Sequence, residues 1–310
     1  MQLDNSTLLL VAAILGATWR MATPIAFAAM GAAYSERTGV VNLGLEGMML
    51  VGAMAAVVGS DKTGNPYIGL AAAFISAALI GVLFAFLVLK LKGDQVVVGI
   101  GINIMALGLT TVLLSAWYGN RGSSDLVTGI PAINLLGSTN NEAVKIIFSQ
   151  SPLAYLLIGV VLLSWFIFYK SPFGFRLRAI GENPAAADAA GIRIVAIQFL
   201  CLALAGGLAG IGGAYLSLSQ TSQFVRDMIG GRGFMGLSAN IFGGWNPLGG
   251  FGASALFGFF MAIQMRLAGT RIPSQIVQMM PYLLTVLALI PATRKSRAPA
   301  SLGVPYHPER

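Results

Sequence analysis

The side chains of this sequence that could do chemistry in apolar surroundings are few, and four of them lie close together. Glu36, Arg37, Asn42 and Glu46 fall in the stretch SERTGVVNLGLEG, residues 35–47, among three glycines. A carboxylate there could bind a proton or a cation, and an amide could hydrogen-bond a polar solute. No basic residue lies beside Glu46 in the sequence. Its partner therefore comes from elsewhere in the fold, or the group exchanges protons.

The sequence lacks the residues that metal binding, nucleophilic catalysis and nucleotide binding require. The sequence has one cysteine, Cys201, within an apolar run, and one histidine, His307. This excludes an intrachain disulfide and argues against a His/Cys metal site or a histidine-based triad. No Gly-x4-Gly-Lys-Ser/Thr loop occurs, so we expect no ATP or other cofactor to bind to this chain. A membrane enzyme would depend on Glu36 and Glu46, which have no evident shared pocket, so we do not expect catalysis.

The composition places these residues in a membrane protein. The 310 residues are 56% hydrophobic and 10% charged, whereas soluble domains carry about 25% charged residues. The net charge is +8, but the basic residues are spread between apolar runs. This pattern is typical of contact with the membrane surface and not of nucleic-acid binding.

Nine apolar segments approach the length that crosses a bilayer, about 20 residues as helix. We therefore predict one domain, 1–310, that is an all-α, polytopic integral membrane helical bundle of about 8–10 helices with broken or re-entrant segments. Two of the nine are short helices within 233–265 that meet at the turn-forming stretch GGWNPLGG, residues 243–250. The other seven segments are 7–33, 48–59, 63–89, 95–120, 146–169, 194–225 and 272–293.

The loops predict an orientation. Ten lysines and arginines fall in one alternate set of loops and seven in the other, and the richer set is expected in the cytoplasm. This places the tail, 294–310, in the cytoplasm and, with nine segments, the N-terminus outside. The loop 119–150 then lies outside, where it either meets an external partner or is an ordinary connection.

The stretch RAIGENPAAADAAGI, residues 178–192, is a short polar island in the predicted cytoplasmic loop 171–194. Asn183 is a good N-cap, Pro184 suits the first helical position, and Gly191 suits the position after the last turn. The alanines between them favour helix. Such a helix is too short to be stable alone, so it either packs on its own bundle or docks on a cytoplasmic partner.

Several other residues have both a structural and a functional interpretation. Asn103 and Asn240 are amides in apolar segments, and Ser217, Ser219 and Gln220 form a polar ridge. Each of these could line a solute path or hydrogen-bond a neighbouring helix. We interpret Gly206 and Gly210 as a helix-packing motif. Gln264, Arg266 and Arg271 are interpreted as interface anchors.

Two of these stretches carry a resemblance that covers most of the chain. SERTGVVNLGLEGMMLVGA (35–53) and RAIGENPAAADAAGI (178–192), with GGWNPLGGFGASALFG (243–258), resemble permease subunits of bacterial ABC importers, in the nucleoside or simple-sugar branch of the ribose and branched-chain amino acid permease superfamily. The resemblance implies a partner ATPase that binds ATP and Mg, a second, longer permease subunit, and an extracytoplasmic substrate-binding protein. It also implies ATPase coupling for Glu182, Asn183, Pro184, Ala185, Ala187, Asp188 and Gly191.

Three functions stay open at this point. The chain is expected to be an importer permease in the inner membrane for a small polar solute, foremost a nucleoside. Alternatively, the solute is a simple sugar such as a pentose, or the chain is an ion-coupled transporter that uses Glu46. We place the solute path at Asn42, Glu46, Asn103 and Asn240, on their polarity and position alone.

Overall fold

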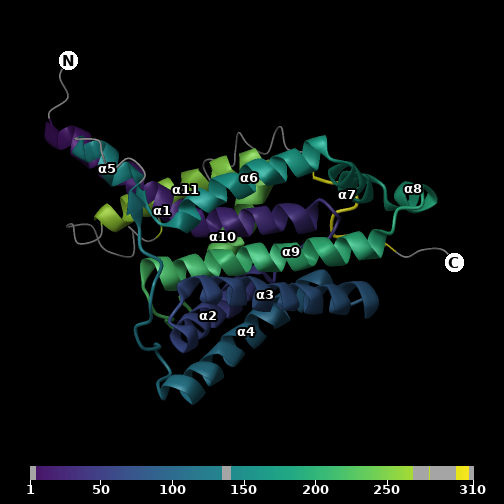
Figure 1. Cartoon of the computed structure of the whole chain (residues 1–310). Helices are drawn as coiled ribbons and strands as arrows, with labels where there is room; N and C mark the ends of the chain where they lie inside the picture. Colours follow the sequence, from purple (N-terminus) through teal and green to yellow (C-terminus); the bar gives the residue numbers. More distant parts are fainter. Residues whose placement is uncertain (1–4, 135–140, 268–278, 280–297, 307–310) are drawn as a thin grey trace.

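A computed structural model describes residues 5–134, 141–267, 279 and 298–306 as a bundle of long helices (Figure 1). Six of the helices in this part of the chain are long and apolar enough to cross a membrane. They are α1 (Asn5–Glu36), α3 (Pro66–Ala85, extended by the π-helical turn η1, Phe86–Lys90), α4 (Gln95–Tyr118), α6 (Pro152–Lys170), α9 (Ile194–Ala214, extended by η2, Tyr215–Gln220) and α11 (Pro247–Leu267).

The bundle has two distinct ends. At one end lie α7 (Pro172–Glu182), α8 (Pro184–Ala189) and residues 298–306 (Figure 1). At the other lies α5 (Glu142–Phe148), beside the first turns of α1. We call these the α8 end and the α5 end. Two further helices, α2 (Leu45–Thr63) and α10 (Arg232–Phe242), complete the architecture.

The predicted all-α fold is confirmed. Eight of the nine expected segments correspond to helices, and the ninth, 272–293, lies outside the described residues. One expectation is corrected, because α11 is not a short helix but runs for 21 residues. Glycine and asparagine form the expected turn before it, and Pro247 takes its first position, where a missing amide hydrogen has no cost. The loop 119–150 holds α5 and a two-stranded sheet of β1 (Ile133–Asn134) and β2 (Ser149–Gln150).

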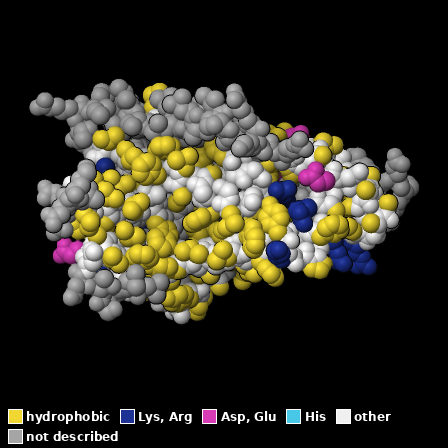
Figure 2. All heavy atoms as spheres, turned by 90° about the horizontal axis from the view of Figure 1, so that it is seen from above, with side chains coloured by type: hydrophobic (Ala, Val, Ile, Leu, Met, Phe, Trp, Pro, Cys, Tyr) yellow, Lys and Arg dark blue, Asp and Glu magenta, His cyan; other side chains and the backbone are white. Residues whose placement is uncertain are grey.

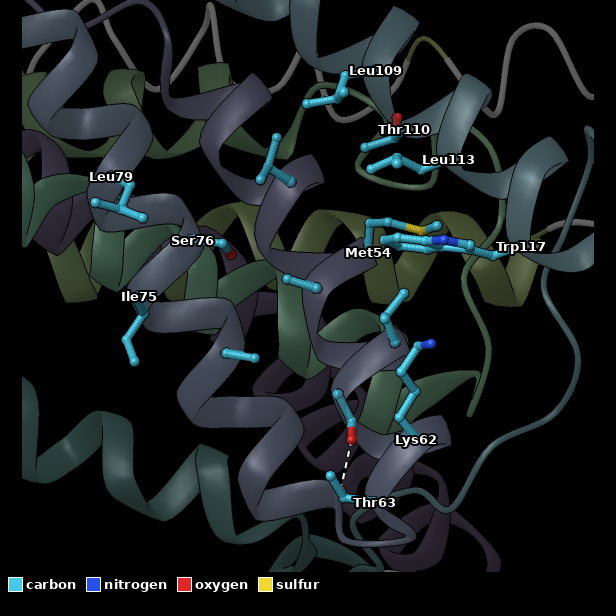
Figure 3. Close-up of a pocket in the computed structure, with 15 residues that line it drawn as sticks. Met54, Lys62, Thr63, Ile75, Ser76, Leu79, Leu109, Thr110, Leu113 and Trp117 are labelled. Carbon is cyan, nitrogen blue, oxygen red and sulfur yellow. Dashed lines mark hydrogen bonds between the residues drawn. The ribbon is translucent and has the colours of Figure 1, made fainter.

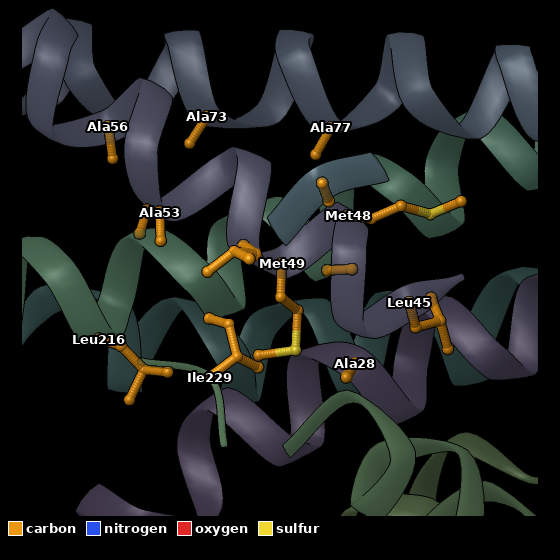
Figure 4. Packing of buried hydrophobic residues seen from close by; sticks show 14 of the residues in the cluster. Ala28, Leu45, Met48, Met49, Ala53, Ala56, Ala73, Ala77, Leu216 and Ile229 are labelled. Atoms are coloured by element: carbon orange, nitrogen blue, oxygen red, sulfur yellow. The ribbon is translucent and has the colours of Figure 1, made fainter. Parts of the chain in front are cut away.

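Small residues hold the centre of the bundle together. Gly206 of α9 lies so close to α3 that an added Cβ would collide with the Ala77 carbonyl oxygen, and Gly210 would meet Ala73 in the same way. Ala73 and Ala77 are fully buried, beside Met48 and Met49 of α2 (Figure 4). The prediction that Gly206 and Gly210 serve packing is confirmed, since only small residues let helix backbones approach this closely.

Candidate solute path and coupling surface

The start of α2 meets the start of α10, and a glutamate joins them. Both oxygens of the Glu46 carboxylate accept backbone hydrogen bonds at 2.7 Å, one from Gly231 and one from Gly233. The first amides of a helix have no intrahelical acceptor and carry partial positive charge. Glu46 therefore supplies an acceptor to the first turn of α10 from a residue 185 positions earlier. The partner that the sequence required for Glu46 is this helix N-terminus.

Backbone conformation makes that contact possible. Gly231, the N-cap of α10, has φ +84°, a region that side chains with a Cβ rarely adopt. A Cβ on Gly233 would lie 2.6 Å from the Glu46 Cα. The glycines at 231 and 233 thus let the α10 backbone reach the carboxylate. Sequence reasoning did not find them, although the run IGGRG was a signal of irregular backbone before a helix.

Asn42 and Asn103 lie at the same junction, on the other side of the α2 start. The Asn103 side chain accepts from the Gly47 amide at 2.8 Å and donates to the Leu43 carbonyl at 2.9 Å. The Asn42 oxygen accepts from the Gly44 amide at 3.0 Å, and this side chain is fully buried. Both amides therefore satisfy backbone groups where α2 begins, so the structure brings Asn42, Glu46 and Asn103 together.

Asn240 belongs to a second cluster, at the opposite end of α10. Its side chain donates to Glu36 at 2.7 Å, and the Trp245 indole N–H donates to the same carboxylate oxygen at 2.7 Å. Arg37 is turned away from the neighbouring Glu36, and its Nε donates to the Trp245 carbonyl at 2.7 Å. Glu36 and Arg37, which are adjacent in the sequence, thus both hydrogen-bond to Trp245 in the turn between α10 and α11.

The Asn240 side chain keeps one buried polar atom, Oδ1, without a hydrogen-bond partner among the residues that the structure describes. Trp245 is a further member of this cluster that sequence reasoning missed. It lies within GGWNPLGG, where a large aromatic residue among turn formers was the available signal. It adopts φ +55°, a strained value for a residue with a Cβ that the surrounding contacts must hold.

The polar ridge after α9 hydrogen-bonds to neighbouring elements. Ser217 donates to the Ala53 carbonyl of α2, Ser219 pairs with Ser151 before α6, and Gln220 donates to the Arg20 carbonyl of α1. These contacts favour the structural interpretation of the ridge. Of the predicted anchors, Arg266 is exposed near the end of α11, and Arg271 lies outside the described residues.

At the α8 end, the predicted helix and its caps are present. α8 covers Pro184–Ala189, and the Asn183 side chain accepts from the Ala186 amide at 3.0 Å. Gly191 has φ +77°, and the Ile192 amide donates to the Ala187 carbonyl, which is the pairing of a Schellman cap. The caps read from the sequence therefore set both ends of this helix.

α8 has one packed side and a large exposed surface. Ala187 is buried against Ile180 of α7 and Ile194 of α9. Most of the other residues predicted for ATPase coupling are exposed, namely Glu182, Asn183, Ala185, Asp188 and Gly191. Hydrophobic side chains cover the middle of the molecule, while lysines and arginines gather toward this end (Figure 2). The helix is thus anchored by its own bundle and still presents a surface to a partner.

One apolar groove among the described residues holds none of the four predicted path residues. It has a volume of about 560 Å³ and lies between α2, α3 and α4, with Met54, Ile75, Leu113 and Trp117 among its lining (Figure 3). Lys62 lies 5.9 Å from the centre of the Trp117 ring at one edge. Because the lining is almost entirely apolar, this groove suits hydrocarbon and cannot replace the hydration of a polar solute.

Comparison with known proteins identifies the family. Residues 14–289 match the family described as branched-chain amino acid transport system / permease component. The guanosine ABC transporter permease protein NupQ of Bacillus subtilis is 35% identical, over 94% of this chain and 96% of its own. The nucleoside ABC transporter permease protein NupC of Lactococcus lactis is 37% identical, over 92% and 93%. A second Bacillus subtilis protein, the guanosine ABC transporter permease protein NupP, is 34% identical over 78% and 71%. Since the family match spans most of its length, the chain belongs to the permease family described as branched-chain amino acid transport system / permease component.

Proposed function

We propose that the chain is a transmembrane permease subunit of an ATP-driven importer for nucleosides. The observation that carries this proposal is its similarity along nearly the full length to two permeases named for guanosine and for nucleosides. The broken helices α2 and α10 support it, because transporters build sites where helices are interrupted. The importer would lie in the bacterial cytoplasmic membrane, with the C-terminus in the cytoplasm and the N-terminus outside.

The proposal assigns α8 to a partner ATPase, which would bind ATP and Mg. A two-turn helix that is capped at both ends and packed on one side keeps its shape when a partner presses on the other side. We assign the coupling to Glu182, Asn183, Pro184, Ala185, Ala187, Asp188 and Gly191. Ala187 would transmit the push into the bundle through its contact with Ile180 and Ile194.

A second permease and an external protein complete the proposed importer. Bacillus subtilis has two guanosine permeases that both resemble this chain, which supports a pair of unlike permease subunits. At the α5 end, Arg121 and Arg226 line a polar hollow of about 550 Å³ with Thr111 and Ser115. Two exposed arginines there suit acidic side chains on an extracytoplasmic binding protein.

For the path, we retain Asn42, Glu46, Asn103 and Asn240 as candidates that act through the two broken helices. Amide side chains can donate to and accept from a nucleobase or a ribose hydroxyl. In this conformation the first three are occupied by backbone groups. A solute would contact Glu46 when α10 moves away from α2, and it would contact Asn42 and Asn103 when the start of α2 shifts. Since both Glu46 oxygens hold helix amides, the geometry favours an anchoring role over that of an ion carrier.

Uptake into proteoliposomes tests the proposal. The chain is reconstituted with its partner ATPase, second permease and extracytoplasmic binding protein, with ATP sealed inside and the binding protein and labelled guanosine outside. We expect uptake that requires ATP, persists when an ionophore collapses the proton gradient, and is competed by unlabelled nucleosides but not by ribose. Uptake that stops with the ionophore at constant ATP would contradict an ATP-driven importer. Competition by ribose alone would assign the solute to the simple sugars.

A further inference from the structure

We propose that residues 298–306, which we call the C-terminal strap, position α8 for its partner, and that Ser301 and Tyr306 are the positioning residues. This inference rests on the proposed function of α8. The strap contacts α7 and α8, although it lies more than 100 residues after them in the chain. It therefore gives both helices a long-range contact that their own segment does not supply. The strap would help to transmit motion of α8 to the membrane helices.

Ser301 closes the end of α7. Its backbone amide donates to the Gly181 carbonyl at 2.9 Å, and its hydroxyl donates to the same carbonyl at 2.7 Å. The last carbonyls of a helix have no intrahelical donor, and here a residue 120 positions later supplies one. Pro299 is buried beside Gly181. The strap is therefore a cap on the helix that leads directly into α8.

Tyr306 reaches α8 itself. Its hydroxyl donates to the Asp188 carboxylate at 3.1 Å, and its ring packs on the small cluster formed by Ile180, Ala187 and Ile194. Ser301, Tyr306, Asn183 and Pro184 also share a surface hollow of about 270 Å³. A partner that seats on the start of α8 would thus contact the strap as well.

The strap also reaches the membrane helices through the bend after α1. The Gly303 amide donates to the Gly39 carbonyl at 2.9 Å. That bend is held by Gln198 of α9, which donates to the Thr38 carbonyl at 3.0 Å. Arg37, directly before this bend, donates hydrogen bonds to the turn between α10 and α11. The strap therefore links α8 to the residues that hold the end of α10.

Amide hydrogen exchange on the full-length chain in detergent tests the strap without any partner. Ser301→Ala with Tyr306→Phe should speed exchange of the Ala187, Ala190 and Ile192 amides by about 5-fold for each bond removed, since one net hydrogen bond contributes about that factor. Ser301→Thr, with Tyr306 unchanged, keeps both hydroxyls and should show the slow exchange of the wild type at α8. Tyr67→Phe, at an exposed site on α3, is the control. Unchanged exchange in the double variant would overturn the proposal.

The assembled importer gives a second readout, the number of ATP molecules hydrolysed per guanosine imported. We expect the double variant to raise this ratio about 5-fold or more, while the complex still assembles. The single variant Ser301→Thr should keep the wild-type ratio. A normal ratio in the double variant would overturn the positioning role. Faster exchange at α8, combined with a wild-type chain that neither binds an ATPase nor imports guanosine, would instead refute the proposed function and leave the strap contacts established.

Discussion

The α3–α9 contact and the α10 helix both depend on close packing in the same bundle, but α10 adds hydrogen bonds to it. Between α3 and α9, Gly206 and Gly210 bring backbone against backbone with no room for a methyl group. α10 also packs closely on α1, since a Cβ on Gly236 would collide with Ala28. In addition, its start hydrogen-bonds to Glu46, and its Asn240 donates to Glu36. Close packing forfeits many contacts if it opens by even a fraction of an ångström. Hydrogen bonds, in contrast, can be exchanged for bonds to water or a solute at small net cost.

This difference indicates which part of the permease stays fixed and which part moves. The α3–α9 pair, with α2 packed against it, is a frame. α10 is a short helix between two polar junctions, so we expect its movement to open those junctions and its contact with α1 while the frame stays closed. Four substitutions test this division, in decreasing order of expected effect.

The largest effect is expected for Gly206→Leu in the frame. Its side chain would collide with the α3 backbone at Ala77, and such overpacking destabilises by about 3 kcal/mol or more when the backbone must shift. The measurement is the yield and thermal unfolding midpoint of the purified chain. Gly159→Leu is the matched control, because a Cβ on this glycine of α6 meets nothing within 4 Å. Equal stability of the two variants would contradict the frame.

The second effect concerns the start of α10. Glu46→Ala leaves the Gly231 and Gly233 amides without their acceptor, at a cost of about 1–3 kcal/mol for each buried group left unpaired. We expect lower thermal stability and little guanosine uptake in proteoliposomes. Glu46→Gln retains one acceptor oxygen and should lie between Ala and wild type. Full stability in Glu46→Ala would show that α10 is held by something other than this contact.

The third effect is at the opposite junction. Trp245→Phe keeps an aromatic ring, though a smaller one, and removes the indole donor to Glu36. We expect the lost hydrogen bond to lower the free energy of unfolding by about 1–2 kcal/mol, beyond the loss from the smaller ring. Asn240 still donates to the same carboxylate, which limits the loss. Trp19→Phe is a suitable control, since the Trp19 indole N–H has no partner among the described residues. If both variants lose the same stability, the Glu36 contact is not the cause.

The smallest effect is expected outside the bundle, at the cap of α8. Gly191→Ala places a Cβ at φ +77°, which costs about 1 kcal/mol. No neighbour lies within 4 Å of that Cβ, so the effect should be confined to the helix end. Hydrogen exchange at the Ile192 amide should become faster, with the unfolding midpoint of the chain unchanged. Gly191→Asn tolerates this conformation better and should exchange more slowly than the alanine variant.

The sequence was sufficient where structure depends on near neighbours. The bounds of α8 follow from Asn183, Pro184 and Gly191, which act within one or two turns. The break before α2 follows from glycines and polar residues that no continuous apolar helix would contain. The sequence could not identify what Glu36 and Glu46 bind, because their partners lie 185 or more residues away and are mostly backbone amides or a turn tryptophan. Such pairings depend on how the helices pack, which local patterns do not encode.

The strap has a consequence for the order in which the protein is made. Its serine closes α7 from 120 residues further along the chain, so the ribosome has already released α7 and α8 when the strap emerges. Until then the Gly181 carbonyl lacks this donor and the bend at Gly39 lacks the Gly303 bond. The surface around α8 is therefore completed only after the membrane helices have been synthesised. A nascent permease that is still being inserted lacks the strap part of the surface that other subunits would contact.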